Sequence, residues 1–106
     1  FDMLGVVDEL HRTKIRLARL RFEKGLHKEA QHILDSIRPE IVLHRTLVHF
    51  ELLQCQMLAE EGKLYPAINT AQHALKHAKR LHAREEIVRI QVLIAELKQK
   101  VSLEKA

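Results

Sequence analysis

Glycine, proline, cysteine and aromatic residues are all scarce in this sequence of 106 residues. With three glycines, two prolines and 46% hydrophobic residues, a collagen-like or disordered chain is excluded. The single cysteine, Cys55, excludes an intrachain disulfide and favours a reducing compartment, cytoplasmic or nuclear. No apolar run approaches the roughly 20 residues of a membrane span, and no signal-peptide pattern opens the sequence. We therefore expect one small soluble domain, and its start at Phe1 predicts a segment of a larger protein.

Helix-forming residues fill nearly every stretch, and β-branched residues never alternate with polar ones over the length of a strand. The sequence therefore predicts an all-α fold. Its breakers are Gly25, Pro39, Gly62, Pro66 and the polar residues 82–84. They divide the chain into five predicted helices, at about 3–24, 27–37, 43–61, 64–81 and 84–103. Gly62 suits a left-handed helix cap.

Comparison of the sequence with itself shows an internal repeat. Shifts of 37 and then 40 residues align the first, third and fifth predicted helices. The aligned columns are Leu10 with Leu47 and Ile87, Ile15 with Leu52 and Val92, Ala18 with Cys55 and Ala95, and Leu20 with Met57 and Leu97. The shift of 37 also pairs residues of the second and fourth helices: Gly25 with Gly62, Ala30 with Ala67, Leu34 with Ala71, and Ile37 with Ala74. The alternative is a five-helix bundle whose columns match by chance.

Each of the two aligned glycines is followed five residues later by an alanine, and a small residue stands seven positions before it. This pattern resembles the tetratricopeptide repeat over about two and a half repeats. Similar long, aromatic-poor repeats occur in scaffold subunits of the anaphase-promoting ubiquitin ligase and in bacterial regulators of the maltose-activator type. The sequence departs from the family at its aromatic positions, which here carry Lys14, Glu51 and Gln91 and then Arg21, Leu58 and Lys98.

The resemblance implies stacked antiparallel helical hairpins in a right-handed superhelix, within a single domain of residues 1–106. Repeat 1 would span about 3–39, repeat 2 about 40–81, and an unpaired or capping helix about 84–104. In this family the first helix of each repeat lines a groove that holds a partner peptide. By position the groove residues are Arg12, Arg19, Glu23, His49, Gln56, Glu60, Arg89, Glu96 and Lys100. The two arginines favour an acidic segment, so we expect a non-catalytic scaffold module for protein–protein interaction.

The last predicted helix has more apolar surface than one preceding hairpin covers. We expect its uncovered part to be a contact face for a missing helix, another subunit or a second copy of the chain. The residues assigned to that face are Ile90, Ile94, Leu97 and Val101.

The sequence gives less support to metal binding, nucleic-acid binding or catalysis. His73 and His77 stand at i,i+4, where two imidazoles can share a metal, but no third ligand is evident and we place both on the solvated face. The basic run 73–84 suggests, as an alternative, a transcriptional regulator or nucleic-acid-binding module. Four Phe and Tyr residues and no Trp leave little for base stacking, which disfavours nucleic acid. No nucleophile elbow or phosphate loop is present, and we expect no enzyme activity, cofactor or metal.

Overall fold

The computed structural model describes residues 3–37 and 44–105, with side chains described over 6–37 and 45–104. These residues form five α-helices and no strand, which confirms the all-α prediction. The helices are α1 (Met3–Glu23), α2 (His27–Ile37), α3 (His44–Glu60), α4 (Leu64–Arg80) and α5 (Arg84–Lys105). Their bounds agree with the predicted ranges to within two residues. Pro39, a predicted helix breaker, and Leu43, the predicted start of the third helix, lie outside the described residues.

Three of the connections are the same tight turn. After α1 the Gly25 amide donates to the Phe22 carbonyl at 2.9 Å and the Leu26 amide to the Arg21 carbonyl at 2.8 Å, the paired bonds of a Schellman motif. Equivalent bonds follow α3 around Gly62 and α4 around His82. The central residues have φ of 83°, 82° and 53°, so the left-handed cap predicted at Gly62 is confirmed, and His82 adopts the same conformation without being a glycine.

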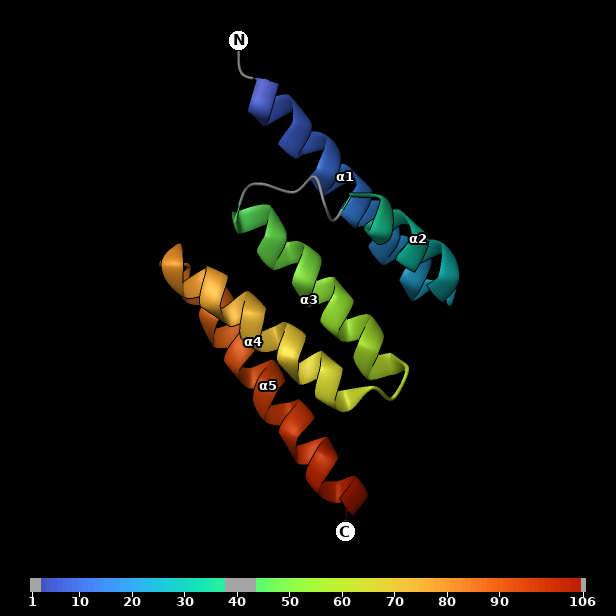
Figure 1. Ribbon diagram of the computed structural model, residues 1–106, viewed down its shortest axis with the longest axis vertical. Helices are drawn as coiled ribbons and strands as arrows, with labels where there is room; N and C mark the ends of the chain where they lie inside the picture. Colours follow the sequence, from blue (N-terminus) through green and yellow to red (C-terminus); the bar gives the residue numbers. More distant parts are fainter. Residues whose placement is uncertain (1–2, 38–43, 106) are drawn as a thin grey trace.

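α1 packs with α2, α3 with α4 and α4 with α5, and α3 lies at the centre. It contacts α1, α2 and α4, while α4 also packs against α5 (Figure 1). The molecule measures 56 × 33 × 19 Å, and the two termini lie at opposite ends of its long axis. Because two layers of helices flank α3, it is buried on two faces.

The two faces of α3 belong to two apolar clusters. The cluster toward the N-terminus consists of Ile15, Ala18, Ala30, Leu34, Ile37, Phe50, Leu53 and Met57. The cluster toward the C-terminus consists of Val48, Leu52, Cys55, Leu64, Ala67, Ile68, Ala71, Ala74, Ala78, Ile90, Ile94 and Leu97. The spacing of the α3 residues in each set places them on opposite arcs of the helix. This helix therefore has neighbours on two sides within the chain.

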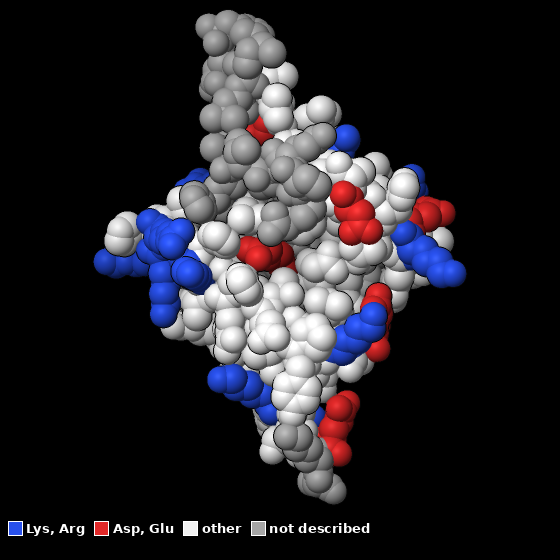
Figure 2. Space-filling view, in the orientation of Figure 1, with Lys and Arg blue, Asp and Glu red and all other residues white. Residues whose placement is uncertain are grey.

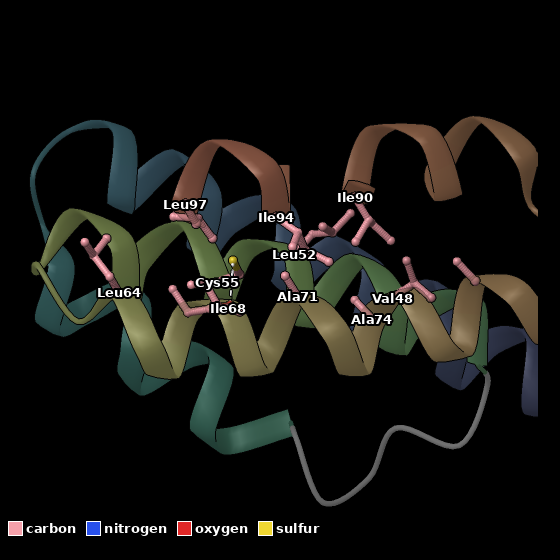
Figure 3. Packing of buried hydrophobic residues seen from close by; sticks show 12 residues of the cluster. Val48, Leu52, Cys55, Leu64, Ile68, Ala71, Ala74, Ile90, Ile94 and Leu97 are labelled. Carbon is pink, nitrogen blue, oxygen red and sulfur yellow. Dashed lines mark hydrogen bonds between the residues drawn. The ribbon is translucent and has the colours of Figure 1, made fainter. Parts of the chain in front are cut away.

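Small residues occupy the crossing of α3 with α4. Cys55 and Ala67 are both fully buried, and the Cys55 thiol donates to the Ala67 carbonyl at 3.1 Å (Figure 3). Burial raises the pKa of this thiol to about 11, so the group is an un-ionised packing residue at neutral pH. A larger side chain at either position would push the two helix axes apart.

Several aligned positions of the repeat are buried alike in the first two hairpins, although Leu10 and Leu20 of α1 are exposed. Four pairs related by the 37-residue shift have no exposed surface in either member: Ala18 with Cys55, Ala30 with Ala67, Leu34 with Ala71, and Ile37 with Ala74. In α5 the third members of two columns, Val92 and Ala95, are exposed. The difference arises because no described helix covers that side of α5.

The prediction of an uncovered contact face on the last helix chose the wrong side of that helix. Ile90 is fully buried, Ile94 and Leu97 are buried, and Val101 packs beside them against the cluster that α3 and α4 form (Figure 3). Ile90, Ile94 and Leu97 are therefore part of the core of the chain and are not available to a partner, while Val101 is partly buried at its edge. The large exposed apolar side chains in the described part of α5 are instead Val88, Val92 and Leu103.

Ile90 and Val88 provide a test of this assignment. Ile90→Ala removes three fully buried side-chain carbons, and we expect it to lower the free energy of unfolding by about 2–4 kcal/mol. Val88→Ala, at a position that is 59% exposed, should change it by less than about 0.5 kcal/mol. Urea unfolding followed by circular dichroism measures both. Equal losses would contradict the placement of α5.

His82 provides a second test. Its φ of 53° is unfavourable for a side chain with a Cβ, so His82→Gly should raise the free energy of unfolding by up to about 1 kcal/mol. Gly62→Ala should lower it by about 1 kcal/mol, and only through the backbone, since an added Cβ meets nothing within 4 Å. Thermal unfolding of the two variants should show midpoints that move in opposite directions.

Candidate functional site

A basic hollow of about 140 Å³ lies where α1 meets α3. Arg12, Ile15, Arg16 and Arg19 of α1 line it, together with His49 of α3. The α1 residues fall on one face because their positions recur at helical spacing. Ile15 is buried and supplies the apolar wall. The hollow has room for several water molecules of about 30 Å³ each, and hence for a small polar group of a partner.

The three arginines differ in how far they are neutralised. The guanidinium of Arg12 lies 4.0 Å from the Asp8 carboxylate, which also accepts a hydrogen bond from the Thr46 hydroxyl. Arg19 donates to the neutral Gln56 side-chain oxygen at 3.1 Å. Arg16 is exposed and has no ion pair within the described part of the chain. The hollow therefore carries an excess of positive charge.

His49 is a half-buried imidazole at the edge of this charge cluster. Its pKa is lowered from the usual 6.5, first by burial and then by the positive charges of three arginines: Arg12, Arg19 and Arg45. Glu86 at the start of α5 opposes these effects in part. His49 is therefore neutral at pH 7 and accepts or donates hydrogen bonds without adding to the repulsion among the arginines.

Four of the nine predicted groove residues meet at this place. Arg12 and His49 line the hollow together, and Arg19 is hydrogen-bonded to Gln56. In each of these pairs the two residues are 37 positions apart, which is the repeat shift. The other five are exposed, and none of them lines this hollow: Glu23, Glu60, Arg89, Glu96 and Lys100.

Arg16 is a lining residue that the sequence analysis missed. The groove positions were transferred from the family's pattern, which includes Arg12 and Arg19 but passes over the arginine between them. Its spacing of four residues from Arg12 and three from Arg19 was the available signal, because such residues share one helix face.

The histidine pair on α4 is arranged differently from the prediction. His73 is exposed, but His77 is partly buried and its Nε2 lies 3.6 Å from the Glu51 carboxylate on α3. The assignment of His77 to the solvated face is therefore wrong, because α3 packs over that part of α4. Among the described residues no group of three or more histidine, cysteine, aspartate or glutamate side chains is placed to hold a metal ion.

Basic side chains also gather at the C-terminal end of α4. His77, Lys79 and Arg80 stand in its last turn, and Arg84 begins α5. Figure 2 shows Lys and Arg side chains gathered at this side of the molecule. Cations are favoured in the last turn of a helix, where they complement the helix dipole. Helix electrostatics thus accounts for Lys79 and Arg80, but not for Arg84, which stands at the N-terminal end of α5.

No family model, curated protein or solved structure matches this chain. Across the described ranges, no helix combines the length and the apolar character needed to cross a membrane.

The charges around His49 predict the direction of its titration. In the folded chain its pKa should lie below the unfolded value of 6.5, so stability falls as the pH drops from above 6.5 toward the folded pKa. Arg12→Gln should raise this pKa by removing a repelling charge, and Glu86→Gln should lower it further. NMR titration of the His49 ring protons measures this pKa in the unmodified chain and in both variants. Shifts of the same sign in both variants would contradict this electrostatic account.

Proposed function

We propose that the chain is a non-catalytic protein–protein interaction module that binds an acidic segment of a partner protein at the basic hollow between α1 and α3. The observation that carries the proposal is the arrangement of Arg12, Arg16 and Arg19 around one hollow, with Asp8 as their one carboxylate within ion-pair distance among the described residues. A carboxylate-bearing peptide supplies the missing negative charge.

The chemistry of the lining residues favours carboxylates. A guanidinium presents a planar fork of N–H donors that matches the two oxygens of a carboxylate, and such charge-assisted bonds are stronger than neutral ones. Arg16 is free to form one, since it has no ion pair within the described part of the chain. Ile15 offers apolar contact to the methylene groups of a Glu side chain. Together these groups recognise both the carboxylate and the methylene groups of an acidic side chain.

The repeat supports a scaffold role, in which the chain is a TPR-like stack of hairpins. Ile90 and Leu97 of α5 align with Phe50 and Met57 of α3, and all four are buried against the preceding hairpin. The aligned position in α1, Leu20, is 54% exposed because no described helix precedes α1. Equivalent positions thus make equivalent contacts wherever a neighbour exists. In such a stack each hairpin presents its first helix to the same groove.

NMR titration tests the proposed binding. The probe is a peptide of glycine and serine with four adjacent central glutamates, added to ¹⁵N-labelled chain. We expect the Nε–Hε signals of Arg12, Arg16 and Arg19 to shift, and the affinity to fall several-fold between about 0.05 M and about 0.3 M salt. The double variant Arg12→Gln/Arg16→Gln should bind about tenfold more weakly.

The matched control is Arg21→Gln/Arg80→Gln, which removes the same charge away from the hollow. Arg21 faces Glu29 at 3.8 Å, and Arg80 is exposed in the last turn of α4. This control should retain most of the affinity. Equal weakening of binding in both double variants would show a diffuse effect of net charge and would contradict a binding site at the hollow. The absence of NMR shifts at the three arginines would contradict it as well.

A further inference from the structure

The charge balance of the hollow distinguishes between anions. Three guanidiniums face one carboxylate, that of Asp8, and His49 is neutral at pH 7. The formal excess is two positive charges. One carboxylate of a partner would neutralise half of it and leave the remaining guanidiniums repelling one another at a spacing of three or four residues along α1. A doubly charged group would neutralise it completely.

A phosphorylated side chain is a doubly charged group of suitable size. It carries about −1.5 to −2 charge at pH 7 and three acceptor oxygens, so it can bind two guanidiniums and the His49 ring at once. The hollow of about 140 Å³ is several times the space of a water molecule. Ile15 forms an apolar wall for the short methylene stem of a phosphoserine.

Few groups of the chain itself compete with a bound anion for the arginine side chains. Arg12 is held at 4.0 Å from Asp8, a long distance for an ion pair, and both of these side chains remain partly accessible. Arg19 is engaged by a neutral amide that contributes no charge. A phosphate would therefore replace weak internal contacts with charge-assisted hydrogen bonds.

From these observations we propose that the hollow is a phosphate-recognition site, and that it binds a phosphoserine of the partner segment in preference to a glutamate in the same position. This inference rests on the proposed function, since it identifies the group that the acidic segment places between the arginines. Arg16 is the residue on which the preference depends most, because among the described residues it has neither the counter-ion of Arg12 nor the hydrogen-bond partner of Arg19.

Anion binding at the hollow is linked to protonation of the His49 imidazole. Burial and the charges of Arg12, Arg19 and Arg45 hold the pKa of His49 low, and Glu86 on α5 opposes them. A dianion bound among the same arginines opposes them further and raises that pKa. Binding of the phosphate should therefore be accompanied by proton uptake at His49.

Three peptides of identical glycine–serine sequence, with phosphoserine, glutamate or serine at the centre, test the preference at pH 7.5. Isothermal titration calorimetry should show the phosphoserine peptide binding at least about tenfold more tightly than the glutamate peptide. Arg16→Gln should abolish most of this ratio, while Arg80→Gln should preserve it. Titrations repeated near pH 6.5 in two buffers of different ionisation enthalpy should show more protons taken up per bound peptide by the unmodified chain than by His49→Gln. Circular dichroism confirms that each variant is folded.

The outcomes separate this inference from the proposed function. Equal affinity for the phosphoserine and glutamate peptides overturns the inference, and shifts at the arginines with the four-glutamate peptide would then leave the proposed function standing. A preference that survives in Arg16→Gln also overturns it, since the phosphate would then be bound elsewhere. If the phosphoserine peptide binds at the arginines and the four-glutamate peptide does not, the phosphate site stands and the broader acidic-segment proposal fails.

Discussion

Burial of α3 on two opposite faces is the constraint on which the rest of the structure depends. Phe50, Leu53 and Met57 pack toward α1 and α2, while Val48, Leu52 and Cys55 pack toward α4 and α5. A hairpin of two helices buries one face of each, so a helix with two apolar faces requires a neighbour on both sides. This requirement joins the five helices into one stack and sets α1 and α3 side by side.

The candidate site is a consequence of that packing. The hollow exists because α1 and α3 lie in contact with Ile15 between them, and residues 37 positions apart then become neighbours. The same shift that pairs buried residues in the core pairs Arg12 with His49 and Arg19 with Gln56 at the surface. A repeat in the apolar pattern thereby brings polar residues from distant parts of the sequence to one place.

Particular residues show how far sequence reasoning extended. Gly25 and Gly62 marked two turns because a left-handed cap favours glycine, whereas the equivalent turn at His82 has no glycine and was found only as a polar stretch. Cys55 shares a column of the repeat with Ala18 and Ala95, and it is fully buried as a small packing residue. The face of α5 was assigned wrongly, because apolar residues cover more than half of that helix and a helical wheel does not say which arc meets α4. His77 was misplaced for a similar reason, since its contact with Glu51 comes from another helix.

The sequence by itself determined the fold class, the five helices, the turns at the two glycines and the register of the repeat. These depend on helix propensity, capping and periodicity, which are properties of residues close together in the chain. The tertiary structure decided which arc of α5 is buried, where His77 lies, and which side chains gather around the hollow. Those outcomes depend on which helices become neighbours, and that choice is made by the combined packing of all five.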